Sequence, residues 1–498
     1  MSRNPGSRDL AVFCSLTIIA VGLGVAAFGW RKAQGDEIAG GVAIVALGGV
    51  LFAWSVASAS PAVARLASLG GLAQVSAVLI YYYPGTALDA ARYHGDAMAV
   101  LGGRPAFGSA SSEWGTDMMA FLLSLLYRLT VPSMLLGFVA FAVIALIGKV
   151  VLARALLLLT PTLGPMATVA AWAVLLLPSL NIWLAAISKE SFVVLGIGLV
   201  LAALLRPARS PNYVMIAVGL GAVSLTRPHI AVLLAFSLVA YAAAYSKMGE
   251  QTLGRRLVMI IVGGLFGLLT LSLAADFLGV EASISGLEEA REDVSTTMDE
   301  GGSNIEQRPI RSVADAPRGV ATVLLRPHLF EADSAAQLAQ AVETTLLAFV
   351  TMFLVVQRRR RARRPVGGIE GSQVRAIRAF TLTYAAGFTY AYSGAYNLGL
   401  MSRQRVQVML PLIVLASTAL VHVVRRSGRS SGRRRGRPDG PVLVVRMPLT
   451  AAEDEPAPNT ASPSPPGPRH RRREWASTPL LRPPCGSGRT STGPGNVS

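Results

Sequence analysis

The stretch WLAAISKESFVVLGIGLVLAALL, residues 183–205, is an apolar run that contains two adjacent charged residues, Lys189 and Glu190. Its length is typical of a membrane span, because a helix needs about 20 mostly apolar residues to cross a bilayer. Similar runs of about 17 to 25 residues recur along the chain, which has 498 residues and is 52% hydrophobic. The sequence therefore predicts an all-α polytopic membrane protein.

About twelve such runs are present, and they predict a helical bundle with roughly that number of membrane spans. The seventh and eighth runs are short and meet at Pro228, so they form either two crossings or one broken hairpin. The first run is too long for a signal-peptide core, which predicts an uncleaved first helix. The predicted spans are 10–30, 38–59, 63–83, 133–152, 163–178, 183–205, 213–226, 229–245, 257–278, 338–357, 376–395 and 406–424.

Positive charge predicts the orientation of these spans. With the N-terminus in the cytoplasm, every cytoplasmic loop carries arginine or lysine, including the run RRRRARR at 358–364. The longest external loop, 279–337, contains the acidic segment EEAREDVSTTMDE instead. This asymmetry follows the positive-inside rule and places both termini in the cytoplasm. The other cytoplasmic charges are Arg65, Lys149, Arg154, Arg206, Arg209, Lys247, Arg255 and Arg256.

Three regions follow from these patterns: an N-terminal three-span segment (1–83), a membrane core (84–424) with external loops at 84–132 and 279–337, and a tail (425–498). The tail is rich in Arg, Ser, Gly and Pro, which predicts a disordered cytoplasmic segment that contacts anionic lipid. Most of the excess arginine behind the net charge of +18 lies in this tail and beside apolar runs. That pattern argues against a nucleic-acid partner.

The loop after the third span carries an unusual group of polar residues. Asp89, Arg92, Tyr93 and Asp96 follow i, i+3, i+4, i+7 spacing, with His94 among them. Residues at this spacing share one face of a helix. We therefore expect a short interfacial helix at the external surface, with these side chains on one face and the alanines toward the other.

Lys189 and Glu190 lie about two helical turns below the external surface in this topology. A lysine buried there without water or a partner would be several kcal/mol unfavourable, so a cavity or an anion is implied. Adjacent residues of a helix point about 100° apart, so we expect the two side chains to have different partners.

Three further external turns carry cationic groups. Arg227, Pro228 and His229 form one turn; Arg326, Pro327 and His328, followed by Glu331, form the second; Tyr396, Asn397, Arg403 and Arg405 lie in the third. Each group also has an ordinary interpretation, because arginines snorkel to head groups, Arg-Pro-His caps or kinks helices, and loop carboxylates are solvated. Five segments nevertheless place charged or imidazole groups at one external depth, which favours a shared site.

Such a site suits a lipid-linked phosphate substrate. Arginines and Lys189 would hold the phosphate, and a carboxylate would accept the proton of an attacking sugar hydroxyl. Asp89 is the first candidate for this general base and Asp96 the second; Glu331 is a further acid. A divalent cation between Asp89 and Asp96 is possible, although no Asp-x-Asp motif is present, and no other cofactor is implied. The candidate substrate-binding residues are Tyr93, His94, Lys189, Glu190, Arg227, His229, Arg326, His328, Asn397, Arg403 and Arg405.

Several segments of the core resemble the polytopic membrane proteins of exopolysaccharide clusters, and are similar to GT-C-type glycosyltransferases and to O-antigen-polymerase-like proteins. The segments are DAARYHGDA (89–97), LPSLNIWLAAISKE (177–190), LTRPH (225–229), LLRPHLFEA (324–332) and NLGLMSRQRVQVMLP (397–411).

The resemblance to GT-C enzymes implies a polyprenyl-phosphate-linked sugar as donor, a glycan acceptor, and an acidic base or metal ligand in the first external loop. Asp89 is the matching position, although its loop follows the third predicted span and the large external domain of many GT-C enzymes is missing. The expected function is a glycosyltransferase with its active face outside a bacterial plasma membrane, in keeping with the Ala-, Arg- and Gly-rich composition. The alternatives are a polymerase that joins lipid-linked repeat units and a lipid-linked glycan transporter or flippase.

Overall fold

The computed structural model describes residues 6–58, 60–84, 88–107, 114–160, 165–206, 212–245, 312–331, 338–346, 369–393 and 397–433, together with residues 261, 264, 265, 310, 349 and 353. All of them belong to one compact unit, Met1–Arg435. Over these ranges the protein is helical and has no strand, which confirms the predicted all-α class. The predicted run 257–278 lies almost entirely outside the described residues, and so do part of 338–357 and the tail beyond 433.

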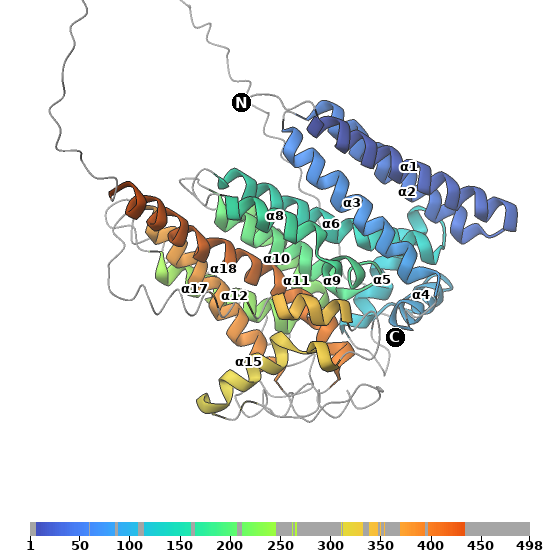
Figure 1. The fold of residues 1–498 in the computed structure, drawn as a ribbon. Helices are drawn as coiled ribbons and strands as arrows, with labels where there is room; N and C mark the ends of the chain where they lie inside the picture. Colours follow the sequence, from blue (N-terminus) through green and yellow to red (C-terminus); the bar gives the residue numbers. More distant parts are fainter. Residues whose placement is uncertain are drawn as a thin grey trace, which may run out of the picture. The chain divides into compact units, whose positions relative to one another are not determined.

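Four helices of the described part are long and apolar enough to cross a membrane. They are α1 (Gly6–Lys32), α2 (Gly35–Ala57), α3 (Pro61–Tyr82) and α6 (Met134–Leu158), shown in Figure 1. Each coincides with one of the first four predicted spans. These helices identify a membrane protein, while the number of twelve spans and the orientation of the chain stay predictions.

The helices at the next two predicted spans, 163–178 and 183–205, are shorter than predicted. α8 (Pro165–Leu176) ends before Pro178, which starts the short helix α9 (Pro178–Ile182). α10 (Lys189–Leu205) begins at Lys189 and not at 183, so the charged pair lies in the first turn of its helix and not about two turns inside it. Residues 183–187 form turns and bends instead, although Leu184, Ala185 and Ile187 are buried.

A buried lysine of α6 contacts the break between α8 and α9. Lys149, assigned above to a cytoplasmic loop, is instead fully buried in α6. Its Nζ donates to Gln74 Oε1 of α3 (2.5 Å) and to Asn181 Oδ1 of α9 (2.8 Å). The Asn181 amide nitrogen donates to the carbonyls of Leu175 and Leu177. These bonds hold the α8–α9 break against α3 and α6.

α10 packs closely on α6 because both helices carry glycine at the crossing. A Cβ added to Gly148 would lie 2.5 Å from Leu195 Cα, and one added to Gly198 would lie 2.5 Å from the Gly148 carbonyl oxygen. Contacts shorter than normal van der Waals separation are strongly repulsive, so only glycine permits this approach. The crossing fixes α10, and with it the position of Glu190.

The following helices agree more closely with the sequence. α11 (Tyr213–Thr226) has the bounds of the seventh predicted span, and α12 (Pro228–Ala244) nearly those of the eighth. Asn212 caps α11 by accepting from the Met215 N–H at 3.2 Å, and Arg227 is the single residue between the two helices.

The C-terminal helices complete the core. α17 (Ile369–Ala391) packs on α12 and on α18 (Leu398–Arg433), as Figure 1 shows, while α15 (Ala316–Leu325) packs on α17 and α18. Short 3-10 turns lie on either side of α15, at Val313–Asp315 and Leu329–Glu331. Fully buried Phe380 and Tyr384 belong to the apolar core between these helices.

The segment predicted as the loop 84–132 contains two helices. α4 (Leu88–Leu101) is the expected short helix, and α5 (Trp114–Leu129) was not expected. α4 buries Ala90, Tyr93 and Ala97. Tyr93 therefore lies on the alanine face and not with Asp89, contrary to the predicted arrangement, because the aromatic ring packs into the core and leaves the charges outside.

Candidate functional site

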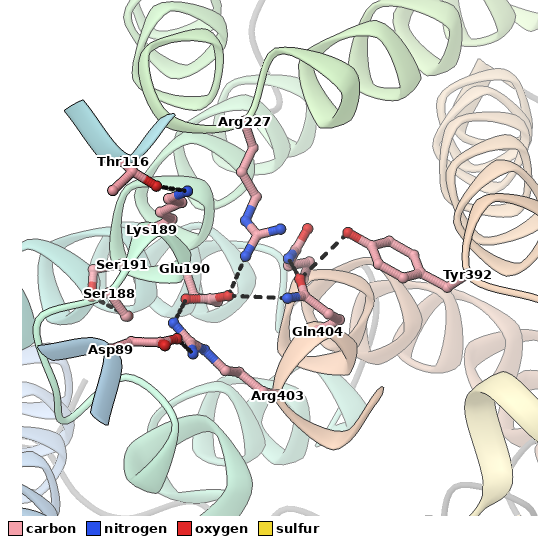
Figure 2. A network of polar contacts seen from close by, with 11 residues as sticks. Asp89, Thr116, Ser188, Lys189, Glu190, Ser191, Arg227, Tyr392, Arg403 and Gln404 are labelled. Carbon is pink, nitrogen blue, oxygen red and sulfur yellow. Dashed lines mark hydrogen bonds and ion pairs between the residues drawn. The ribbon is translucent and has the colours of Figure 1, made fainter. Parts of the chain in front are cut away.

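Four segments that are distant in the sequence meet around Glu190. Figure 2 shows the Glu190 carboxylate between Arg227 of the α11–α12 junction and Arg403 of α18, with Asp89 of α4 on the far side of Arg403. Lys189 lies next to Glu190 in the chain. These five predicted site residues form what we call the Glu190 cluster.

Glu190 is the buried centre of this cluster. Its side chain is 0% exposed, and Arg227 Nη2 donates to Oε1 at 2.6 Å while Arg403 Nη2 donates to Oε2 at 3.1 Å. Gln404 Nε2 makes a longer contact with Oε1 at 3.4 Å. The carboxylate also lies in the first turn of α10, where the helix dipole favours negative charge. Two guanidiniums and a helix N-terminus together make this buried charge tolerable.

The local sequence explains why Arg227 reaches Glu190. Pro228 is the first residue of α12, a position that proline favours because its φ is already helical and its missing N–H is not needed. A residue before proline is driven out of the α region, and Arg227 has φ −146° and ψ 77°. The backbone therefore turns at Arg227, and its side chain, 13% exposed, points to Glu190.

Arg403 connects a buried carboxylate with an open one. Its Nη2 donates to Glu190 and its Nη1 donates to Asp89. The side chain of Arg403 is 18% exposed, whereas that of Asp89 is 57% exposed. Asp89 is thus the carboxylate of the cluster that solvent or a substrate reaches directly.

Lys189 and Glu190 have different partners, as expected for adjacent residues of a helix. Lys189 Nζ donates to Thr116 Oγ1 of α5 at 3.1 Å and lies 6.0 Å from the centroid of the Tyr93 ring. Gly115 leaves room for it, because a Cβ there would lie 3.1 Å from Nζ. Burial raises the pKa of the Tyr93 hydroxyl, so that group stays a neutral donor beside the lysine.

Two predicted residues of α4 lie apart from the cluster. His94 Nδ1 forms a hydrogen bond of 2.7 Å with the Tyr127 hydroxyl of α5. Asp96 accepts from Arg104 Nη2 at 2.9 Å and lies 4.0 Å from Arg92 Nε. Of the two candidates for the general base, only Asp89 contacts a cationic group of the cluster.

The second Arg-Pro-His turn forms a separate group. Arg326 Nη2 donates to Glu331 Oε1 at 2.6 Å, and the His328 N–H donates to Glu331 Oε2 at 2.9 Å. Burial alone would raise the pKa of Glu331, but these hydrogen bonds lower it below its usual value. Arg405 donates to the carbonyls of Val323 and Arg326. These side chains brace the end of α15, in line with the ordinary interpretation of the turn.

Two of the remaining predicted residues lie at helix starts. Asn397 Oδ1 accepts from the Leu400 N–H at 3.1 Å, so this residue caps the start of the helix that carries Arg403. His229 is half-buried in the first turn of α12, two residues after Arg227. Tyr396 lies outside the described residues.

Sequence reasoning missed several polar residues. Gln404 accepts from the Tyr392 hydroxyl at 3.4 Å and from the Gln407 amide, and it extends the Glu190 cluster toward α17. Thr116 was missed because α5 was not predicted. The available signal was the pair Gln404 and Gln407, one turn apart beside the predicted run 406–424, since polar groups inside membrane helices are usually partnered or functional.

A further buried carboxylate was also missed. Glu343 Oε1 accepts from the Ser179 N–H at 2.9 Å, at a small pocket that Arg405 and Ser402 also line. Its position in the predicted run 338–357 was the signal, because an ionisable residue in an apolar run is rarely incidental.

Within the described ranges no group of three or more His, Cys, Asp or Glu side chains is placed to hold a metal ion. Asp89 and Asp96 have separate arginine partners, so these two carboxylates do not converge as a cation site would require. No protein-family model, curated protein or solved structure matches the chain.

Proposed function

We propose that the protein is a membrane glycosyltransferase of cell-envelope polysaccharide synthesis, which uses a polyprenyl-phosphate-linked sugar at the external face of a bacterial plasma membrane. One observation carries this proposal. Asp89, Lys189, Glu190, Arg227 and Arg403, which were selected from the sequence as parts of one phosphate-handling site, lie together in the Glu190 cluster.

The cations of the cluster suit a phosphate group. Arg227 and Arg403 are fixed by Glu190, so their guanidiniums are oriented before a substrate arrives. Such preorganised donors stabilise negative charge on a phosphate leaving group more effectively than mobile ones. Lys189, the residue before Glu190, adds a third cationic group, which is directed to Thr116 of α5. Glu190 itself serves as the positioning residue of the arginines, because its carboxylate is fully buried.

Asp89 is the general base in this proposal. The acceptor hydroxyl oxygen attacks the anomeric carbon of the donor, the bond from that carbon to the phosphate oxygen breaks, and the phosphate departs with the electron pair. The hydroxyl proton passes to the Asp89 carboxylate. A single exposed carboxylate facing the phosphate-binding cations suits direct displacement with inversion.

The profile of lipid-linked glycans tests this proposal. In cells that lack the gene, mass spectrometry should detect units that lack one sugar, and wild-type protein should restore complete units. Asp89→Asn and Arg403→Gln should fail to restore them, whereas Arg92→Gln, which changes a 63% exposed arginine of the same helix, should succeed. Restoration by both site variants would overturn the proposal. Complete units that accumulate without long chains would indicate a polymerase instead.

The external location has its own test. Arg92→Cys in a protein without other cysteines places a thiol on the exposed side of α4, near Asp89. A membrane-impermeant maleimide should label it in intact cells. Labelling only after the membrane is opened would place the cluster in the cytoplasm and exclude an external donor site.

A further inference from the structure

The two carboxylates that Arg403 binds differ in their access to solvent. Glu190 is 0% exposed and also holds Arg227, so it has no route out of the cluster. Asp89 is 57% exposed and contacts Arg403 on the open side. An anion that approaches from solvent can therefore replace Asp89 on Arg403 but cannot replace Glu190.

The chemistry of phosphate favours such a replacement. A phosphate carries more negative charge than a carboxylate and offers more acceptor oxygens for the guanidinium. The Asp89 carboxylate is 57% exposed and is also solvated by water, so the internal contact is a modest competitor for an incoming phosphate.

We propose that Asp89 occupies, in the free protein, the place on Arg403 that the phosphate of the substrate takes, and that phosphate binding releases the Asp89 carboxylate. This inference rests on the proposed function and adds how the binding of the donor would control the access of the acceptor to Asp89. Without donor the Asp89 carboxylate is held by the Arg403 guanidinium and is not placed to meet an acceptor hydroxyl. With donor bound, Arg403 turns to the phosphate and Asp89 becomes available to the acceptor hydroxyl. The base is thus active only when the leaving group is in place.

Binding of inorganic pyrophosphate to the purified full-length protein in phosphatidylcholine nanodiscs tests the exchange by calorimetry. Asp89→Asn removes the internal competitor and should tighten pyrophosphate binding about two- to fivefold, the factor that corresponds to an exposed ion pair. Asp96→Asn is the matched control, because it removes the same charge from the same helix but from a residue that pairs with Arg104. It should leave the affinity close to wild type. Arg403→Gln should weaken binding strongly.

Two outcomes would overturn the exchange. Unchanged or weaker binding in Asp89→Asn would mean that Asp89 does not compete with phosphate. An equal gain in Asp89→Asn and Asp96→Asn would mean that the change in overall charge, and not the contact with Arg403, controls affinity. A third arm replaces phosphatidylcholine with phosphatidylglycerol: if Asp89→Asn responds to the anionic head group but not to pyrophosphate, the exchanged anion is a membrane lipid and the substrate form of the proposal is wrong.

Failure of the exchange and failure of the proposed function give different results. If Asp89→Asn tightens pyrophosphate binding and also restores the lipid-linked glycan profile, the exchange is supported while the catalytic role of Asp89 is lost. If the variant fails to restore that profile but binds pyrophosphate like the wild type, Asp89 is needed for function without competing for Arg403.

Discussion

Replacing Glu190 with glutamine removes the charge that Arg227 and Arg403 share while nearly keeping the shape of the side chain. Glu190 is 0% exposed, and the two arginines are 13% and 18% exposed, so water compensates the loss only in part. Removing one partner of a buried ion pair is typically 3–5 kcal/mol unfavourable. Arg403 keeps Asp89, and both guanidiniums keep some contact with solvent, so we expect about 3 kcal/mol.

Reversible unfolding of the full-length protein in mixed micelles, with increasing SDS, measures this change. Asp96→Asn breaks a more exposed pair and should cost less than about 1 kcal/mol. The double variant Glu190→Gln, Arg227→Gln should be more stable than the sum of its single variants predicts, by about 1 kcal/mol or more, because the second change removes an uncompensated cation. A Glu190→Gln effect as small as that of Asp96→Asn, or strict additivity, would refute the buried bridge.

Three further outcomes follow from other contacts. Lys149→Met should destabilise the protein by about 1–3 kcal/mol, since the side-chain oxygens of Gln74 and Asn181 lose the ammonium; a stabilised variant in the same unfolding assay would contradict this. Gly148→Ala should cost about 1–3 kcal/mol through overpacking, whereas Gly49→Ala, where a Cβ meets nothing within 4 Å, should not destabilise. The lowered pKa of Glu331 means that its ion pair stabilises the fold above its unfolded pKa, near 4.5, and is lost as the pH falls; thermal unfolding against pH should show a smaller acid effect in Glu331→Gln.

The apolar runs predicted the helices where local signals also marked their ends. Asn212 caps α11 and Pro228 starts α12, so both bounds were readable from the sequence. The run 183–205 predicted a helix start that is six residues too early, because hydropathy indicates burial and not backbone conformation. Leu184 and Ile187 are fully or almost fully buried although they lie in turns and bends. Their hydropathy is therefore the same as that of residues inside a buried helix.

α5 was missed for the opposite reason. Its apolar stretch MMAFLLSLLY lies between Asp117 and Arg128 and is too short to count as a membrane span, although its buried residues Met119, Leu123 and Tyr127 recur at helical spacing. A search for periodicity, and not only for spans, would have found it. The face of α4 that holds Tyr93 depended on this unpredicted partner, since α4 and α5 pack together.

The members of the Glu190 cluster could be chosen from the sequence, because charges beside apolar runs are uncommon and usually partnered. The sequence could not show which of these residues contact one another. Arg403 lies 213 positions from Glu190 and 314 from Asp89, and these contacts depend on how α4, α10 and α18 pack. The contact of Gln404 with Glu190 was equally hidden, since the sequence does not show which side chains the packing brings together.

The placement of the cluster at helix ends explains why its two carboxylates behave differently. Asp89 and Glu190 both lie in the first turn of a helix, where backbone N–H groups and the dipole favour an anion. Glu190 adds two buried guanidiniums to that stabilisation, so its removal should weaken the fold. Asp89 has one guanidinium and open solvent, so its removal should instead vacate a cation for another anion. Arg403 joins the two, and a single arginine can therefore be structural on its buried side and exchangeable on its open side.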